Sequence, residues 1–412
     1  MSRAIRRSGL ALACAGAAFL GVSASAAAVA PPQLSVTAAG LIEASTGQQL
    51  YGVNADAELP IASTTKIMTA LVTLQRVRSL NTVFTQNDWY PAEADSQIGL
   101  VPGERMTERD LLVALMLPSA DDAAEDLAYN VGGGSVANFV AMMNADAQAI
   151  GLTHTHYSTP IGLDTPGNYS SAWDLDTLAA YVMAHSSLFR QIVAMPAATL
   201  ATGPVRYVVN RNDLVGRVRW VNGVKTGHTA DAGYVLVASG TRDGMTLIGS
   251  VLGTSSELER DQNALALLDY GFAEFRLVKP LVAGQQLAVL HVNGQPYAHA
   301  AVLAGGAFTH VVKRSDSVHV RLSLPRDLTG PLRRHAVVGH ATVLIDGAAA
   351  ASIPVLLAQA LPAAPSSSML AGISSRTLLV LLLVVTFVVL VLTAVRLHLR
   401  LRVTARDRVE AR

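Results

Sequence analysis

The stretch Ala62-Ser63-Thr64-Thr65-Lys66-Ile67-Met68-Thr69-Ala70 places a hydroxyl and an amine three residues apart at the start of a helical pattern. Apolar residues recur with helical spacing after the lysine and Pro60 precedes it, which predicts a helix from Thr64 to Val77. Residues three apart share a helical face, so Ser63 and Lys66 point the same way. A serine becomes a nucleophile when a base removes its proton, and a buried lysine with a lowered pKa can be that base. The alternative is a helix cap beside a solvated lysine.

A second segment, Ser119-Ala120-Asp121, follows the helical pattern of Thr107 to Met116. Its serine is a candidate for relaying a proton to a leaving amine. The alternative is a serine and an aspartate that cap the helix predicted from Ala123 to Tyr129, because both residue types are favoured at helix N-caps.

A third segment, Lys225-Thr226-Gly227, precedes the strand-like run from Gly233 to Ser239. On an inner strand Lys225 would be a second buried cation that lowers the pKa of Lys66. Burying it without a negatively charged partner would be costly. The glycine would let a substrate lie close to the backbone.

The backbone amides of Ser63 and His228 are candidates for an oxyanion hole, in which one donor is typically worth roughly 3 kcal/mol. His228 follows the third segment, and we expect it to shape the pocket and not to act as a base. The other histidines have no metal-ligand spacing, so we expect no metal.

The three segments occur in the order S-x-x-K, S-x-D, K-T-G, which resembles the signature of penicillin-binding proteins and serine β-lactamases. The chain is more specifically similar to the low-molecular-mass D-alanyl-D-alanine carboxypeptidases, serine peptidase family S11. Further similarity lies in Asn210-Arg211-Asn212, in Ala232-Gly233-Tyr234 and in the segment from Pro331 to Gly339. The resemblance covers roughly Leu34 to Leu357 and implies a β-lactamase/transpeptidase-like catalytic domain followed by a small β domain.

The resemblance implies a two-step acyl transfer on the D-Ala-D-Ala end of peptidoglycan stem peptides. Ser63 would attack the carbonyl between the two D-alanines, and Lys66 would accept its proton. Ser119 would help to protonate the departing D-alanine, and water would then hydrolyse the acyl-enzyme. No metal or organic cofactor is needed for this chemistry.

The resemblance also implies a binding site for the terminal carboxylate of the substrate. Lys225, Thr226 and Arg260 would bind it, because cations and a hydroxyl suit a carboxylate. Gly227 and His228 would line the same site. Penicillin and other β-lactams mimic this substrate and would leave the nucleophilic serine stably acylated.

Two departures from the family pattern are visible. Asp121 stands where the family usually has asparagine, and an anion near Lys66 would hold the lysine charged and oppose its role as a base. Alternatively, Asp121 would balance Lys66 and Lys225 together and leave activity intact. The second departure is the membrane anchor. Many relatives end in an amphipathic helix that lies on the membrane, whereas we expect this chain to span it.

Three other functions compete with the carboxypeptidase. A class A β-lactamase would need a deacylating glutamate in a Glu-x-x-Leu-Asn-type loop, which the sequence lacks. A D,D-endopeptidase that cleaves cross-links uses identical chemistry, but such relatives often lack the β domain. A catalytically weak wall-binding scaffold is supported by Asp121 alone.

Both ends of the chain carry membrane signals. Residues 1–28 combine arginines, an apolar run and small residues, which is the pattern of a secretory signal peptide. The only cysteine, Cys14, lies in this segment, so the mature chain has no thiol. The uncharged run 377–395 is long enough to cross a hydrocarbon core of roughly 30 Å. The arginines of the tail 396–412 place that tail in the cytoplasm, so the body lies on the periplasmic or extracytoplasmic side of the inner membrane.

Between these ends we expect an α+β catalytic domain over 34–276, a small all-β domain over 279–357 and a linker over 358–376. Strand-like runs flank a helical middle, so a sheet should join the two ends of the catalytic domain. The net charge of +1 gives no indication of nucleic-acid binding. Helical patterns also occur at 135–151, 172–185 and 260–275, and strand-like runs at 36–56, 207–210, 245–252, 286–291, 299–303, 310–312, 318–324 and 341–345.

Overall fold

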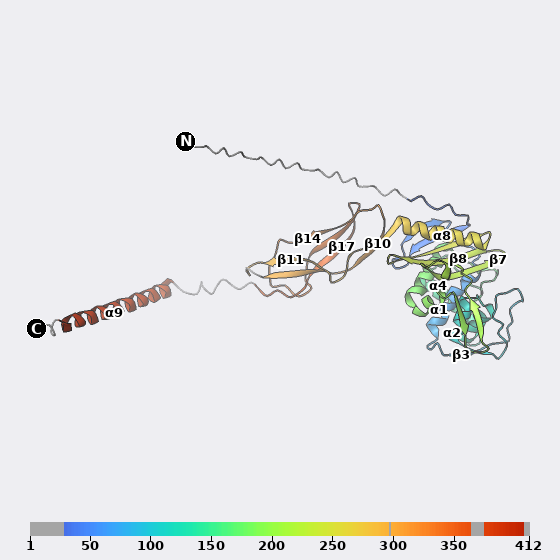
Figure 1. Ribbon diagram of the computed structural model, residues 1–412, viewed down its shortest axis with the longest axis horizontal. Helices are drawn as coiled ribbons and strands as arrows, with labels where there is room; N and C mark the ends of the chain where they lie inside the picture. The colour runs from blue at the N-terminus through green and yellow to red at the C-terminus, as the bar shows by residue number, and fades with distance from the viewer. Residues whose placement is uncertain (1–28, 296–297, 364–374, 408–412) are drawn as a thin grey trace, which may run out of the picture. The chain divides into compact units, whose positions relative to one another are not determined.

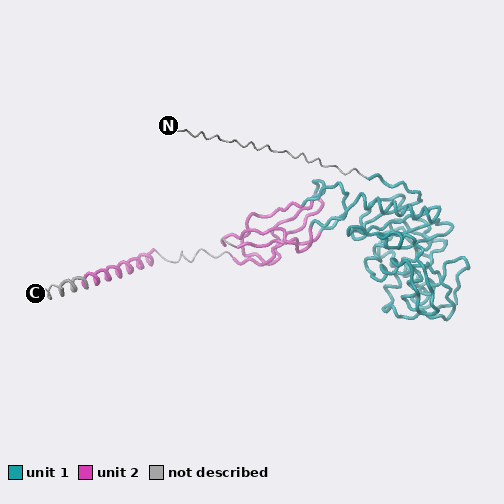
Figure 2. Tube along the Cα trace, viewed as in Figure 1, with its two compact units in different colours: residues 1–280, 308–319, 344–348 teal, residues 281–307, 320–343, 349–412 magenta. Residues whose placement is uncertain are grey.

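A computed structural model describes residues 29–295, 298–363 and 375–407 (Figure 1). The predicted signal peptide 1–28, most of the predicted linker and the end of the predicted tail lie outside these residues. The chain folds into two compact units, and Figure 2 shows each in its own colour. The first runs to Pro280 and also includes Phe308–His319 and Leu344–Ala348.

A five-stranded antiparallel sheet forms the centre of the first unit, in the order β2-β1-β9-β8-β7. The sheet joins the first strands of the chain to strands from beyond residue 220, which confirms the predicted α+β arrangement. The sequence interpretation of Lys225 on an inner strand is wrong, because its strand β7 is the last of the sheet. An edge strand leaves one row of backbone groups unpaired. The strands are β1 Ala38–Glu43, β2 Gln49–Val53, β7 Val221–Thr229, β8 Gly233–Arg242 and β9 Met245–Thr254.

Both faces of this sheet are covered, which explains why its strands are apolar in succession. Along β8, Val235 and Val237 belong to the core that packs against most of the helices, whereas Leu236 and Ala238 face the core under α8. Figure 1 shows α8 on one side of the sheet and α1, α2 and α4 on the other. The helices are α1 Lys66–Arg76, α2 Glu108–Met116, α3 Asp121–Val131, α4 Val136–Ile150, α5 Ala172–His185, α6 Ser187–Val193, α7 Leu214–Arg217 and α8 Glu257–Glu274.

Two small hairpins and a two-stranded sheet complete the first unit. The hairpins are β3 with β4 and β5 with β6, and the sheet pairs β10 with β13. Their bounds are β3 Val83–Thr85, β4 Arg105–Thr107, β5 Ala197–Leu200, β6 Arg206–Val209, β10 Phe275–Leu281 and β13 Phe308–Lys313.

The second unit holds a six-stranded sheet in the order β14-β16-β17-β12-β11-β15, so the predicted all-β region is confirmed. Strand β17 was not predicted, because its first residues are alanines, which have a low preference for strands. The strands are β11 Gln286–Val292, β12 His299–Ala304, β14 Val318–Ser323, β15 Asp327–Leu328, β16 Val337–Ile345 and β17 Ala348–Leu357.

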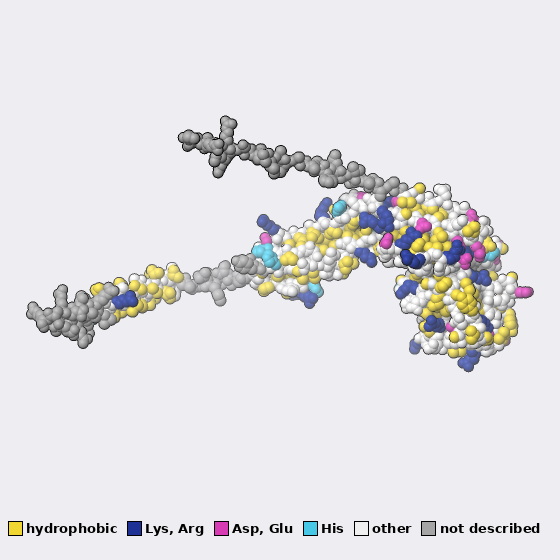
Figure 3. Space-filling view, viewed as in Figure 1, with side chains coloured by type: hydrophobic (Ala, Val, Ile, Leu, Met, Phe, Trp, Pro, Cys, Tyr) yellow, Lys and Arg dark blue, Asp and Glu magenta, His cyan; other side chains and the backbone are white. Residues whose placement is uncertain are grey.

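Helix α9, Ser375–Asp407, lies in the last segment of the second unit. Its stretch Ser375–His398 is long and apolar enough to cross a membrane, by length and composition. Hydrophobic side chains remain exposed along its described part, as Figure 3 shows. An exposed helix of this composition needs an apolar surrounding to cover it.

Asp176 of α5 carries a carboxyl that is buried between this helix and the sheet. Asp176 is fully buried, and the Ser250 hydroxyl of β9 donates to its Oδ1 at 2.5 Å. Gly40 of β1 makes room for it, since a Cβ there would lie 2.5 Å from Asp176 Oδ2. Burial raises the pKa of Asp176 well above its usual range, so the carboxyl is neutral over much of the acidic and neutral range.

This neutral carboxyl predicts a pH-dependent stability. In the unfolded protein the pKa of Asp176 is about 3.9, so above this pH unfolding releases the proton that the folded protein holds. The burial of Asp176 therefore lowers the free energy of unfolding more and more as the pH rises towards the pKa of the folded state. Asp176→Asn retains an acceptor for Ser250 and cannot ionise. We expect the melting temperature of the variant minus that of the wild type to increase as pH rises from about 5 to 8.

The matched control is Asp243→Asn, which removes an exposed carboxylate from the same unit. Its melting-temperature difference should stay nearly constant over this range. A constant difference for Asp176→Asn would show that Asp176 is ionised in the folded protein.

Candidate active site

Ser63 and Lys66 meet where a 3₁₀ turn, Ala62–Thr65, leads into α1. The lysine side chain is fully buried, and its Nζ donates to Ser63 Oγ at 2.9 Å and to the Ile161 carbonyl at 2.8 Å. The solvated alternative for Lys66 is therefore wrong. The two side chains share one helical face, so the nucleophile candidate and the amine are in direct contact.

The contact with Ile161 depends on a glycine that the sequence analysis missed. Gly162 has φ +92°, and a Cβ there would lie 2.1 Å from the Ala62 carbonyl oxygen. No side chain fits, so Gly162 lets this loop approach the turn that carries Ser63. Asn168 holds the same loop by donating to Thr65 Oγ1 at 3.2 Å.

Ser119 and Asp121 lie at the junction of α2 and α3. Ala120 occupies the N-cap position of α3 without a side-chain cap, so the capping alternative for Ser119 is wrong. Ser119 has φ +68°, and its buried Oγ has no hydrogen-bond partner among the described residues. Asp121 begins α3 and places its Oδ1 2.5 Å from Lys66 Nζ. A buried hydroxyl without a partner is thus available to a bound molecule.

The next residue, Asp122, fixes the loop that covers this junction. Its Oδ2 accepts the backbone N–H groups of Ile98 at 3.1 Å and Leu100 at 2.9 Å. The Asp121 amide donates to the Ser96 carbonyl of the same loop at 2.7 Å. The start of α3 therefore positions both an active-site carboxylate and the rim of the cavity.

Strand β7 brings the third segment against the serine. A Cβ on Gly227 would lie 2.9 Å from the Ser63 nitrogen and 2.9 Å from Ala62 Cβ, so only glycine allows this approach. The candidate oxyanion donor on Ser63 therefore lies against the edge strand. His228 is exposed at the strand's end, where its ring lies 4.0 Å from that of Tyr234, centroid to centroid.

Lys225 is buried, and its Nζ donates to the Thr226 carbonyl at 2.9 Å. Within the described part of the chain it forms no ion pair with a carboxylate. Burial, together with the charges of Lys66 and Arg211, lowers the pKa of Lys225 well below its usual range. Burial also lowers the pKa of Lys66, against the opposing effect of Asp121. The two ammonium groups repel each other, which disfavours charge on both.

The three segments line one cavity of about 160 Å³. Arg260, in the first turn of α8, reaches its wall and donates from Nε to Asp261 at 2.9 Å. Arg211 also lines it, and its guanidinium makes no ion pair with any described residue, so it is free to bind an anion. The sequence analysis used Arg211 only as a family marker and did not assign it to the site. The lining residues are Ser63, Ala94, Ser96, Ser119, Arg211, Thr226, Gly227, His228, Glu257 and Arg260.

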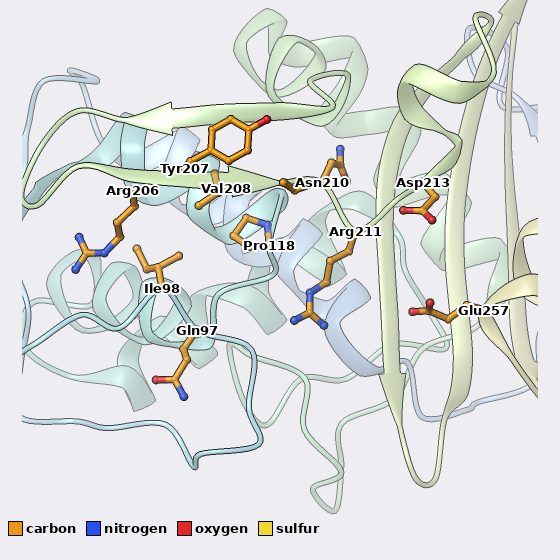
Figure 4. A pocket seen from close by; sticks show the side chains of 11 residues that line it. Gln97, Ile98, Pro118, Arg206, Tyr207, Val208, Asn210, Arg211, Asp213 and Glu257 are labelled. Carbon is orange, nitrogen blue, oxygen red and sulfur yellow. The ribbon is translucent and has the colours of Figure 1, made fainter.

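A larger cavity of about 740 Å³ adjoins this one and shares Arg211 and Glu257 with it (Figure 4). The hairpin β5–β6 forms one wall through Tyr207 and Val208, and the loop between β3 and β4 contributes Gln97. A molecule bound at the serine can therefore extend into a second, open space. In the described ranges, no three His, Cys, Asp or Glu side chains come together to hold a metal.

Comparison with known proteins agrees with this arrangement. The family described as Peptidase_S11, D-alanyl-D-alanine carboxypeptidase, matches residues 25–256. That range covers more than half of the chain. The chain belongs to this carboxypeptidase family. The carboxypeptidase of Streptomyces sp. strain K15 is 37% identical over 265 residues, which are 60% of this chain and 91% of that protein.

Longer relatives match across the β unit as well. The carboxypeptidase DacA of Haemophilus influenzae is 31% identical over 334 residues, which are 77% of this chain and 83% of that protein. The crystal structure of penicillin binding protein 5 from H. influenzae has a TM-score of 0.66 at 30% identity and covers 81% of this chain and 99% of its own. The D,D-transpeptidase structure of Streptomyces K15 has a TM-score of 0.57 and covers 60% of this chain and 100% of its own. The family resemblance in the three segments is thus accompanied by a shared fold.

The close approach at Gly227 predicts the effect of one added methyl group. Gly227→Ala would push the turn that carries Ser63 away from β7 and disturb the Ser63 amide. We expect acylation by fluorescent penicillin to slow by about 100-fold or more, the usual effect of losing one oxyanion donor. Gly306→Ala is the control, because its Cβ would meet only Ile353 at 3.6 Å. Acylation of Gly227→Ala at the wild-type rate would contradict this account of the strand.

Proposed function

We propose that Ser63 is the nucleophile of a serine D-Ala-D-Ala carboxypeptidase that removes the terminal D-alanine from peptidoglycan pentapeptides. One observation carries this assignment. Ser63 Oγ lies 2.9 Å from the Nζ of a fully buried lysine, at a cavity lined by members of all three segments. Family membership indicates the reaction class, and the geometry supports the proposed residues.

In the first step, Ser63 Oγ attacks the carbonyl carbon between the two D-alanines, and its proton passes to Lys66. The carbonyl oxygen becomes an oxyanion beside the Ser63 amide, which stabilises it. Ser119, whose hydroxyl has no other partner in the described part of the chain, passes a proton to the departing amine. Water then attacks the acyl-enzyme by the same proton route in reverse.

The charge of the cavity suits a substrate that ends in a carboxylate. Arg211 and Arg260 line it from two different elements, and Thr226 adds a hydroxyl. Lys225 is buried, donates to the Thr226 carbonyl and does not itself line the cavity. Guanidinium groups bind carboxylates through charge-assisted hydrogen bonds, which position the scissile bond over Ser63. A β-lactam presents the same carboxylate and a strained amide, so it acylates the same serine.

The proposed location rests on the membrane signals near the two ends of the sequence. Helix α9 spans the cytoplasmic membrane, with its arginine-rich end in the cytoplasm and the catalytic unit on the other side. This places the enzyme where peptidoglycan is built. The length and composition of Ser375–His398 support the proposal.

The nucleophile is tested by labelling. Wild-type protein in detergent should bind fluorescent penicillin covalently, whereas Ser63→Ala should show no labelling above background, because the hydroxyl proposed to form the acyl-enzyme is removed. Ser45→Ala, which changes a serine in a surface turn, is the matched control. Labelling that survives Ser63→Ala would rule out Ser63 as the nucleophile.

The reaction is tested by offering a pentapeptide and a cross-linked dimer together. Mass spectrometry should show release of D-alanine from the pentapeptide at least about tenfold faster than cleavage of the dimer. Predominant cleavage of the dimer would instead identify a D,D-endopeptidase. Ser63→Ala should remove both activities.

A further inference from the structure

Lys66 Nζ contacts three oxygens, which makes its role as a base problematic. Ser63 Oγ lies at 2.9 Å, the Ile161 carbonyl at 2.8 Å and Asp121 Oδ1 at 2.5 Å. An ammonium has three N–H donors and no lone pair, so it satisfies all three oxygens but cannot accept a proton. Before Lys66 can deprotonate Ser63, one of its protons must move elsewhere.

Asp121 is the group placed to receive that proton. Its side chain is 5% exposed and that of Lys66 0%, so neither charge is solvated by water. Asp121 Oδ1 faces Lys66 Nζ at 2.5 Å, which is within the hydrogen-bond distance that a proton transfer between the two groups requires. Burial away from water disfavours the ion pair relative to the neutral amine and carboxylic acid. The difference in free energy between these two states is therefore smaller in the protein than in solution.

The protonation preferences of the two groups agree with this picture. Burial lowers the pKa of Lys66, and burial raises the pKa of Asp121. In each case the attraction of the partner acts in the opposite direction. The pair thus holds one proton that either member can carry, and its titration belongs to both groups together.

We propose that Asp121 and Lys66 act as a single proton-sharing base, in which Asp121 holds the proton that Lys66 gives up before it deprotonates Ser63. This inference rests on the proposed function of Ser63. It also gives the aspartate that replaces the family's usual asparagine a role of its own, because an asparagine amide cannot accept that proton.

The protons balance through one turnover. The pair begins with one proton on Asp121, and Lys66 takes a second from Ser63 as the C–O bond to the substrate forms. One proton then passes by way of Ser119 to the departing amine as the C–N bond breaks, which returns the pair to one proton. In deacylation the pair takes a proton from water and returns it to Ser63 Oγ as the ester bond breaks.

Other charges face this pair from the neighbouring elements. Lys225 comes from β7, Arg211 from the segment after β6, and Asp95 from the loop that covers α3. The repulsion by Arg211 favours loss of charge from Lys66, whereas Asp95 favours retention of the proton on both members of the pair. These three groups influence the pH at which the pair gains or loses a proton, but none of them contacts Lys66 Nζ.

The test is the pH dependence of acylation by fluorescent penicillin, measured in detergent for the full chain between about pH 5 and pH 9. Proton transfer inside the pair leaves its proton count unchanged, so the wild-type rate should vary by less than about threefold over the central part of this range. In Asp121→Asn, Lys66 must release its proton to solvent. The acylation rate of Asp121→Asn should therefore fall about tenfold for each pH unit below the pKa of Lys66. Plotted against pH, this rate and the flat wild-type rate should cross.

Two results would overturn the proposal. One is an Asp121→Asn rate that exceeds the wild-type rate at every pH, because Asp121 would then merely hold Lys66 charged. The other is a wild-type rate that itself rises about tenfold per pH unit, a result that needs no variant and so does not depend on the folding of Asp121→Asn. Asp95→Asn is the matched control, since it removes a nearby charge without touching Lys66; it can shift the pH at which the plateau ends, but the plateau itself should remain. Loss of all labelling in the wild type would instead refute the proposed function.

Discussion

The burial of the Lys66 amino group among three oxygens is the constraint on which the site depends. An isolated buried charge is strongly disfavoured, so each neighbour must be placed to compensate it. The Ile161 carbonyl comes from a loop that only Gly162 allows to approach, and Asp121 comes from the first turn of α3. Ser63 lies one helical turn away in the same segment. Three separate parts of the catalytic unit therefore converge on one nitrogen.

The edge position of β7 gives this arrangement its opening. An inner strand would have both rows of backbone groups paired, whereas β7 has a neighbour on one side only. The turn that carries Ser63 packs against the strand at Gly227, and the cavity opens there. Positive side chains from two further elements, Arg211 and Arg260, line that opening. The sheet thus provides both a rigid support and an accessible row of polar groups.

Much of this fold could be predicted from the sequence, because local patterns determine it. The hairpin of β1 and β2 and the helices α1 and α5 follow from apolar periodicity and turn residues. The edge position of β7 could not be predicted, because strand order is set by contacts between distant segments. For the same reason the Ile161 carbonyl, 95 residues from Lys66, left no signal in the motif that carries the lysine. The buried Asp121–Lys66 contact was foreseeable as a proximity, but its geometry required the packing of α3 on α1.

The two glycines that enclose Ala62 have a consequence for the evolution of drug resistance. Gly162 and Gly227 each have no room for a Cβ, so the two walls nearest Ser63 are closed to substitution. Variants that escape a β-lactam while keeping the reaction are therefore expected on the exposed rim, at a position such as Glu257. An inhibitor that draws its affinity from the glycine-lined walls would leave this enzyme few mutational routes of escape.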